Sequence, residues 1–362
     1  GSGGGDDDDD DDSAATVQRH KEEAARLKRL TSTKVEDKIK EVTSADYYFS
    51  SYSHFGIHEE MLKDEVRTLG YRRAVGADNT NLKDKIVLDV GCGTGILCMF
   101  AAQAGAKHVY GIDCSDIIDQ AREIVAANGF ADKITLIKGK AEEVTLPVDK
   151  VDAIISEWMG YFLLYESMLD TVLYARDKWL VEGGQMYPDR ATIVLGGIED
   201  SEYKASKLDW WSDVYGFDFS CIRKIAMLEP LVDVVEPHML VTDLCVFKTL
   251  DVTKCTKSDL AFEAPWTLTA HCDDWVHALT AHFDVEFAHC PQPFGFSTGP
   301  HAEYTHWKQT VFYLENPVEM RKGDVLKGTI TVAPNAKNPR DLDITILYIF
   351  KDSTWSQQYR LR

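Results

Sequence analysis

The alternation of short apolar strands with helices between residues 85 and 180 limits the possible folds of this chain more than any other feature. Apolar, β-branched runs predict strands at 85–90, 108–112, 134–137 and 151–156. Helical patterns lie at 60–73, 96–104 and 167–180, and a further helix follows the second strand and ends at about residue 128. Strands joined through helices run parallel and need helices on both faces of their sheet. This rhythm therefore predicts a doubly wound α/β domain.

The pattern changes after Tyr187-Pro188. Strand-like runs such as 275–287 and 328–332, separated by Gly, Pro and Asp turns, predict a second, antiparallel β-domain that resembles a barrel. An aromatic, helix-like segment lies inside it at about 201–226. The predicted plan is an acidic tail at 1–16, a helical or lid segment at 17–59, the α/β domain at 60–187 and the β-domain at 188–362.

Acidic residues outnumber basic ones by 59 to 39, which gives this chain of 362 residues a formal charge of −20. Nucleic acid is disfavoured as a direct partner, because its binding depends on Lys and Arg side chains that neutralise phosphates. An acidic surface instead attracts basic protein tails and speeds their encounter. Part of the charge is local, since an Asp run at 6–12 follows a Gly-rich leader and is expected to be disordered.

The eight cysteines are scattered without a Cys-x-x-Cys pair. This favours reduced thiols and an intracellular location, cytoplasmic or nuclear. No apolar run reaches the ~20 residues that a membrane helix needs, so no membrane contact is expected. No basic stretch followed by an apolar one marks a secretory signal.

A stretch rich in His and Cys at 271–290 raises the question of a zinc site. Strand alternation places Trp275, His277 and every second residue through Phe287 on one face, and His282 on the other. The candidate ligands then lie on opposite sides of the strand, so no metal is expected. Those candidates are His271, Cys272, His277, His282, His289 and Cys290.

A Gly-rich turn at 91–95 follows the first strand and opens a helix, so that a ligand can approach the backbone closely. Asp89 can reach into the same crevice, and Asp113, 24 residues further on, can accept hydrogen bonds from ribose hydroxyls. A dinucleotide site and a purely structural turn are the alternatives. The Gly-x-Gly-x-Gly spacing lacks the dinucleotide fingerprint and fits a compact nucleoside with an amino-acid tail, such as S-adenosylmethionine.

Ala141 and Glu142 follow the third strand, where loops line the same crevice. Glu142 can meet the adenine amino group of such a cofactor. Taken alone, a Glu at this position is more often a surface carboxylate.

The segment at 156–169 places two carboxylates, Glu157 and Glu166, on either side of an apolar, aromatic loop that contains a Gly for bending. It begins just beyond the fourth strand, where the active sites of such sheets form. Charges beside so much hydrocarbon are costly unless a cation pairs with them. A guanidinium is the natural guest, because its planar fork of donors matches carboxylates.

This double-glutamate loop resembles the hallmark loop of the protein arginine methyltransferases. The Tyr-Phe segment near Tyr48, the Gly-rich turn and Thr305-His306-Trp307 are also similar to motifs of that family, in the same order. The resemblance runs from about Asp46 to the C-terminus and is strongest to the type I members, which form asymmetric dimethylarginine. It implies a Rossmann-like methyltransferase domain, a β-barrel-like domain with a helical dimerisation arm, and S-adenosyl-L-methionine as cofactor.

The resemblance also implies catalytic roles. Glu157 and Glu166 are expected to grip the substrate guanidinium. His306 is expected to pair with Asp64 near the substrate entrance, where the pair relays a proton or makes only a structural hydrogen bond. Tyr52 is also expected to be a catalytic residue, and it resembles part of an aromatic lid that folds over the cofactor.

Arg67 resembles the arginine that binds the cofactor carboxylate and steadies Glu157, and Met61 and Met168 resemble the pair that flanks the target nitrogens. The family commonly has Glu where this chain has Asp113, and the shorter acid needs a closer sugar or a water. The other cofactor contacts implied by the resemblance are Tyr48, His58, Gly91, Gly93, Asp113, Ala141 and Glu142, with Asp89 shaping the turn.

The resemblance implies products and partners as well. Met61 is not bulky in the way Phe is, which favours a second methyl group on the same nitrogen. Segment 201–226 corresponds to an arm that docks on a second subunit, so a homodimer or higher oligomer through Trp210, Trp211 and Tyr215 is expected, with a homologous subunit as a further option. Arginine-rich proteins of the Arg-Gly-Gly type are the expected substrates.

Two other classes of function remain open. The chain could be a catalytically silent subunit that scaffolds an active homologue, although intact Glu157, Glu166, Arg67 and Gly91 argue against this. It could also methylate small molecules. The second β-domain, the acidic surface and the double-glutamate loop disfavour that alternative.

Overall fold

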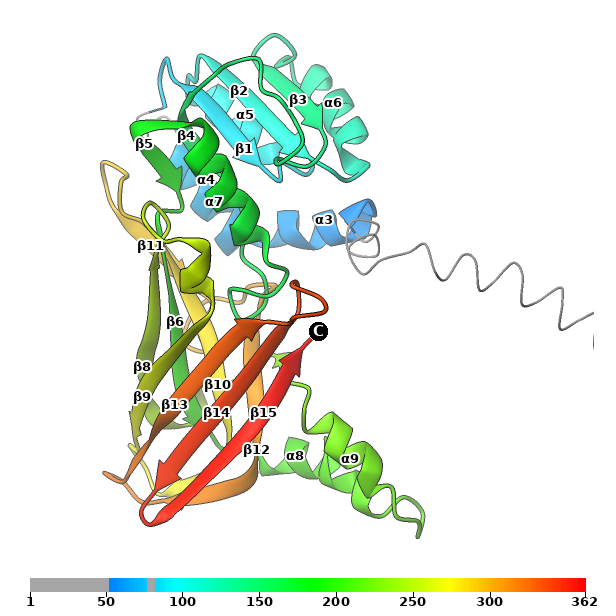
Figure 1. Cartoon of the computed structure of the whole chain (residues 1–362), viewed down its shortest axis with the longest axis vertical. Helices are drawn as coiled ribbons and strands as arrows, with labels where there is room; N and C mark the ends of the chain where they lie inside the picture. The colour runs from blue at the N-terminus through cyan, green and yellow to red at the C-terminus, as the bar shows by residue number, and fades with distance from the viewer. Residues whose placement is uncertain (1–51, 77–81) are drawn as a thin grey trace, which may run out of the picture. The chain divides into compact units, whose positions relative to one another are not determined.

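The computed structural model describes residues 52–76 and 82–362 (Figure 1). They belong to one compact unit, Tyr52–Arg362. The predicted acidic tail at 1–16 and residues 17–51 of the predicted segment at 17–59, Tyr48 among them, lie outside the described residues. Among the residues that are described, no helix is both long and apolar enough to cross a membrane.

The α/β domain contains a five-stranded parallel sheet with the order β3-β2-β1-β4-β5. Its elements are β1 (Ile86–Val90), α5 (Ile96–Gln103), β2 (His108–Asp113), α6 (Ile117–Ala127), β3 (Ile134–Lys138), β4 (Val151–Ile155), α7 (Met168–Trp179) and β5 (Leu180–Tyr187). The chain runs from β1 outward to β3 and then returns to β4 on the other side of β1. The carboxyl ends of β1 and β4 thus flank a topological switch point, where open α/β sheets bind ligands. The predicted doubly wound domain is confirmed.

Two helices, α3 (Phe55–Lys63) and α4 (Glu65–Val75), lie where the sequence predicts one helix at 60–73. The chain leaves the helical conformation at Asp64, whose ψ is 96°. The Asp64 carboxylate caps α4 by accepting a hydrogen bond from the Arg67 backbone N–H at 3.0 Å, which explains the break. The predicted domain boundary between residues 59 and 60 falls inside α3, so no break in the fold marks it.

The β-domain consists of two antiparallel sheets. One has the order β7-β12-β10-β6-β8, with β11 paired to β10, and the other has the order β15-β14-β13-β9. The elements are β6 (Arg190–Ile198), β7 (Leu231–Asp233), η2 (Pro237–Met239), β8 (Leu240–Asp251), η3 (Lys257–Leu260), β9 (Phe262–Thr269), β10 (Asp274–Phe287), β11 (Phe294–Ser297), β12 (Gln309–Met320), β13 (Val325–Pro334), β14 (Leu342–Phe350) and β15 (Ser353–Leu361). Large side chains such as Trp266, Phe312 and Tyr359 are fully buried between the sheets and form the core. The predicted barrel-like domain is confirmed.

The alternation predicted for β10 is wrong at the start of the strand. Trp275 is 44% exposed while Val276 is fully buried. The register with β12 shifts between Val276 and Ala278, so a β-bulge reverses the phase there. Within residues 52–76 and 82–362, no three His, Cys, Asp or Glu side chains come together as a candidate metal site.

The predicted helix-like segment at 201–226, called the arm below, consists of α8 (Ser201–Lys207), η1 (Asp209–Ser212) and α9 (Ser220–Ala226) (Figure 1). Asp209 forms ion pairs with Lys204 and Arg223, and Arg223 reaches Glu315 of β12. These pairs fix the arm against the barrel. Tyr203 stacks on Tyr313 of β12, whereas Trp210, Tyr215, Phe217 and Phe219 are exposed in the protomer, and Tyr215 is 93% exposed.

Candidate functional site

The Gly-rich turn between β1 and α5 lies close beneath two other segments. Gly91 has a φ of +76°, and a Cβ placed on it would lie 2.4 Å from Met168 Cε. A Cβ on Gly93 would lie 3.3 Å from the ring of His58. The turn therefore forms a cradle that any larger residue would fill, with His58 from α3 and Met168 from α7 at its rim.

Asp113, at the end of β2, ties two of the crevice loops together. Its Oδ2 accepts a hydrogen bond from the Gly93 backbone N–H at 2.8 Å. Its Oδ1 accepts from both the backbone N–H and the hydroxyl of Ser115, at 2.8 and 2.6 Å. The carboxylate thus fixes the position of the Gly-rich turn relative to the end of β2.

Asp89 lies directly under the same turn and is fully buried. Its Oδ2 accepts a weak hydrogen bond from the Cys98 thiol at 3.1 Å. Its Oδ1 has no hydrogen-bond partner among the described residues. Burial raises the pKa of Asp89 to about 7, because water no longer solvates the charge. An orphaned acceptor beneath the Gly-rich turn fits a site built for a polar ligand.

Ala141 and Glu142 follow β3, as predicted, but their exposures differ. Ala141 is buried, whereas Glu142 is exposed, and its Oε1 accepts a hydrogen bond from the Thr171 hydroxyl at 3.0 Å. The Glu142 carbonyl accepts a further bond from the Tyr174 hydroxyl at 3.3 Å. These contacts connect the loop after β3 to α7.

Arg67 and Glu157 form a buried ion pair. Arg67 Nε lies 2.8 Å from Glu157 Oε2, and the two side chains are only 7% and 8% exposed. The other Glu157 oxygen accepts a hydrogen bond from the Met159 backbone N–H at 3.2 Å. Arg67 Nη1 also donates to the Met61 carbonyl at 3.3 Å. The pair therefore joins the end of α3 and the start of α4 to the double-glutamate loop, and removing one partner would leave a buried charge uncompensated.

The loop between β4 and α7 has a compact, strained backbone. Four of its non-Gly residues have positive φ angles, namely Phe162, Leu163, Glu166 and Ser167. Gly160 is required where the loop closes on itself, because a Cβ there would lie 2.1 Å from the Tyr165 carbonyl oxygen. At the root of the loop, Ser156 Oγ donates to the Val90 carbonyl at 2.7 Å. Strained backbone of this kind persists only where surrounding contacts determine it.

Glu166 lies at the far end of this loop, where Tyr52 donates a hydrogen bond from its hydroxyl to Glu166 Oε2 at 2.8 Å. The Tyr52 carbonyl accepts a hydrogen bond from His58 Nε2 at 2.7 Å. Tyr52, which precedes α3, and His58 of α3 thus connect the Gly-rich turn to the second carboxylate.

His306 and Asp64 are in contact, as the sequence predicts. The Asp64 Oδ2 atom lies 2.7 Å from His306 Nδ1 and 2.9 Å from the His306 backbone nitrogen. Burial opposes ionisation of Asp64, but hydrogen bonds from His306 and the Arg67 N–H outweigh it and lower the Asp64 pKa. Beside this pair, Trp307 donates its indole N–H to the Met159 carbonyl at 2.8 Å. The β-domain therefore contacts the double-glutamate loop directly.

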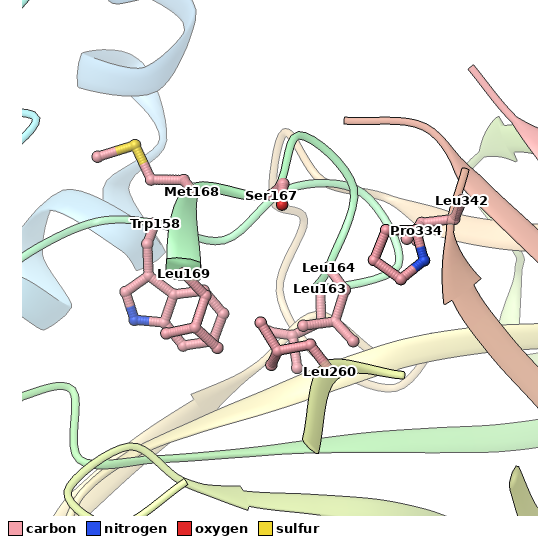
Figure 2. A pocket seen from close by; sticks show the side chains of 9 residues that line it. All are labelled: Trp158, Leu163, Leu164, Ser167, Met168, Leu169, Leu260, Pro334 and Leu342. Carbon is pink, nitrogen blue, oxygen red and sulfur yellow. The ribbon is translucent and has the colours of Figure 1, made fainter. Parts of the chain in front are cut away.

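A small cavity lies behind the double-glutamate loop (Figure 2). Figure 2 shows Trp158 and Leu169 on one side, Leu163, Leu164 and Leu260 together, and Pro334 and Leu342 from the β-domain opposite. Its lining is apolar apart from Ser167. The loop therefore packs against the barrel through buried leucines and leaves a small gap beside Ser167.

The structure brings together nearly all of the predicted site residues that it describes. One contact that the sequence analysis missed is Arg340, in the hairpin between β13 and β14. Its Nη1 donates to the Glu166 carbonyl at 3.0 Å, across 174 residues of sequence. No local pattern marks an arginine in a turn as a contact of so distant a loop.

The chain is similar to known families and proteins along most of its length. Residues 87–184 match a methyltransferase domain family, and residues 189–354 match the arginine methyltransferase oligomerization subdomain. Protein arginine N-methyltransferase 1.1 of Arabidopsis thaliana is 57% identical over 326 residues, which cover 89% of this chain and 84% of that protein. Protein arginine N-methyltransferase 1 of Dictyostelium discoideum is 56% identical over 330 residues, which cover 90% of this chain and 97% of that protein.

Two solved structures are also similar. The Trypanosoma brucei PRMT1 enzyme–prozyme heterotetrameric complex with AdoHcy has a chain that is 49% identical, with a TM-score of 0.84, over 86% of this chain and all of that one. Arabidopsis thaliana protein arginine methyltransferase 10, in an open conformation, is 30% identical with a TM-score of 0.79, over 87% of this chain and all of that one.

Proposed function

This chain belongs to the protein arginine N-methyltransferase family, and from that premise we propose that Glu157 and Glu166 hold the substrate guanidinium. It is a type I enzyme that uses S-adenosylmethionine to form monomethyl- and asymmetric dimethylarginine in proteins. The observation that carries the proposal is the independent support of the two carboxylates. Arg67 holds Glu157, and Tyr52 contacts Glu166.

S-adenosylmethionine supplies, when bound, a methyl group on a positively charged sulfur. The Gly91 cradle and the orphaned Asp89 oxygen beneath it are features that a polar cofactor would fit. We assign Arg67 to the cofactor carboxylate and Asp113 to the ribose. The remaining assigned contacts are Tyr48, His58, Met61, Asp89, Gly91, Gly93, Ala141, Glu142 and Met168.

Glu157 and Glu166 place two carboxylates around the substrate guanidinium, and Arg67 offsets part of their charge before the cofactor binds. At 4 Å in an effective dielectric near 20, each carboxylate attracts the guanidinium by about 4 kcal/mol before desolvation is subtracted. Arginine stays protonated at any ordinary pH, so the carboxylates work by orienting it and by drawing positive charge away from the attacking nitrogen.

His306 is suited to accept the proton that leaves the methylated nitrogen. Asp64 faces its Nδ1, which favours the tautomer with hydrogen on that atom and leaves Nε2 as the acceptor. Asp64 also caps α4, so the pair has a structural role in addition to any transfer of the proton.

The chain forms an oligomer through the matched oligomerization subdomain. We propose that the arm makes this contact, with Trp210, Trp211 and Tyr215 docking on a second copy. For substrates we propose arginine-rich proteins of the Arg-Gly-Gly type, since the net charge of −20 attracts basic chains and disfavours nucleic acid. All eight cysteines are free thiols, which supports a cytoplasmic or nuclear location.

Methyl transfer from labelled S-adenosylmethionine to an Arg-Gly-Gly-rich peptide tests the proposal, with products resolved by mass spectrometry. We expect monomethyl- and asymmetric dimethylarginine from the wild type. Glu166→Gln should lower the rate by roughly 100-fold or more, because one of the two charges that hold the guanidinium is lost. A Glu166→Gln enzyme with wild-type turnover would exclude Glu166 from the guanidinium site. An inactive wild type that still binds cofactor would favour the scaffold alternative.

A further inference from the structure

Glu166 is held from the β-domain by two hydrogen bonds with Arg340. The Glu166 backbone N–H donates to the Arg340 carbonyl at 2.9 Å, and Arg340 Nη1 donates to the Glu166 carbonyl at 3.0 Å. Arg340 thus engages both backbone polar groups of the residue, one through its own backbone and one through its side chain. Neither bond involves the Glu166 carboxylate, which remains directed toward Tyr52.

The backbone at Glu166 needs such support. Glu166 and Ser167 have φ angles of +76° and +60°, in the left-handed region that is strained for a non-Gly residue. On the barrel side, Leu164 and Ser167 line a small apolar cavity together with Pro334 and Leu342 (Figure 2), so the packing is incomplete at this point. The polar contacts with Arg340 lie beside that cavity, at the hairpin that joins the strands of Pro334 and Leu342.

The hairpin that carries Arg340 is itself well ordered by hydrogen bonds. The Asn335 N–H donates to the Asp341 carbonyl at 2.9 Å, and Asn338 Nδ2 donates to Asp341 Oδ1 at 2.7 Å. Asn338 Oδ1 accepts from the Arg340 N–H at 3.4 Å. A rigid turn of this kind can set the position of a second loop rather than follow it.

We propose that Arg340 is a positioning residue for Glu166, and that the β13–β14 hairpin thereby sets the geometry of the guanidinium site. The proposal rests on the assignment of Glu166 to that site. Arg340 acts through the Glu166 backbone and touches neither substrate nor cofactor in this scheme. Its guanidinium also lies close enough to Tyr165 and Cys114 to act against the burial that raises their pKa values, which places its charge beside the loop.

The test compares Arg340→Met, Arg340→Lys, Glu166→Gln and the double variant Arg340→Met with Glu166→Gln in the full-length enzyme. Arg340→Met removes the side-chain donor but keeps the carbonyl acceptor. We expect it to lower kcat by roughly 10- to 100-fold, as displacement of a catalytic group by a fraction of an ångström does. The KM for S-adenosylmethionine should stay within about twofold of the wild type, because the cofactor residues are untouched. Arg340→Lys, which keeps a cationic donor, should recover part of the rate.

The double variant separates positioning from a general structural role. If the only effect of Arg340 is to position the Glu166 carboxylate by holding its backbone, adding Arg340→Met to Glu166→Gln should cause no further loss of kcat. If the double variant instead shows the product of the two single losses of kcat, the proposal is wrong. A wild-type kcat in Arg340→Met would also overturn it. Lys337→Met, an exposed position on the same hairpin, removes the same charge and should leave kcat unchanged. Calorimetric binding of S-adenosylhomocysteine shows whether each variant is folded. An active Glu166→Gln enzyme would contradict the Glu166 assignment itself, which is a different result from an unaffected Arg340→Met.

Discussion

At the scale of single residues, Asp89 combines complete burial with incomplete hydrogen bonding. It lies under the Gly-rich turn, accepts one weak bond from Cys98 and leaves Oδ1 without a partner among the described residues. An unfolded Asp loses its proton near pH 3.9, whereas burial raises the Asp89 pKa to about 7 in the fold. Between these values the folded state binds more protons than the unfolded state. The contribution of Asp89 to the free energy of unfolding therefore falls as the pH rises from about 4 to about 7.

Asp89→Asn should remove this dependence. In the absence of cofactor, the wild type should lose at least about 1 kcal/mol of stability relative to the variant between pH 5 and pH 7, since one pKa unit corresponds to about 1.4 kcal/mol. Urea unfolding at pH 5, 6 and 7 measures the difference. Asp149→Asn, at an exposed acid of the same domain, is the control and should follow the wild type. Parallel stability curves for Asp89→Asn and wild type would show that Asp89 does not titrate in this range.

At the scale of elements, the β1–α5 turn shows how a local conformation and a neighbouring side chain act together. Gly91 has a φ of +76°, and Met168 from α7 lies over its α-carbon. An alanine there would both strain the backbone and displace the flexible Met168 side chain toward the space above the turn. Gly129, after α6, has the same φ of +76°, but a Cβ at that position would meet no atom of the described residues within 4 Å. Gly129 therefore isolates the backbone effect.

Gly91→Ala should lower the affinity for S-adenosylmethionine by roughly tenfold or more while costing about 1 kcal/mol of stability. Gly129→Ala should show the same cost in stability with wild-type affinity. Isothermal titration calorimetry and thermal unfolding measure the two quantities. Equal cofactor affinity in the two variants would mean that the space above Gly91 is not the cofactor site.

Elements governed by local sequence were the predictable part of the fold. Strands β1 and β2 were predicted to within one residue, because their apolar runs end in a Gly turn and in Asp113. The break between α3 and α4 was missed, although Asp is a preferred N-cap residue and the Asp64 carboxylate caps α4. The bulge in β10 depends on its register with β12, and Arg340 meets Glu166 only through the tertiary fold. Motif residues of the candidate site and partners such as Arg67 and Asp64 were therefore accessible from sequence, whereas the contact with Arg340 was not.

At the scale of the whole molecule, the arm presents a set of exposed aromatic side chains that the protomer leaves uncovered. Trp210 is 46% exposed and Tyr215 is 93% exposed, while ion pairs fix the base of the arm against β12. Exposed Trp and Tyr of this kind are enriched in protein interfaces. The rigid base means that a partner would bind a largely preformed surface.

The variant Trp210→Ala with Tyr215→Ala should convert the oligomer to monomer at micromolar concentration and reduce methyl transfer. Light scattering after size-exclusion chromatography measures the mass. Trp275→Ala is a matched control, because Trp275 is 44% exposed but lies on β10 rather than on the arm. A fully active monomer, or dissociation caused equally by Trp275→Ala, would contradict a role for the arm in assembly.

The contacts of Trp307 and Arg340 with the double-glutamate loop have a consequence for how such enzymes can diverge. The catalytic loop belongs to one domain in sequence, but its shape is specified by residues of the other. The two domains are therefore not interchangeable modules. A chimera that joins this α/β domain to the barrel of a relative should keep its parallel sheet, yet it would inherit a foreign template for its guanidinium site unless hairpin and loop were transplanted together.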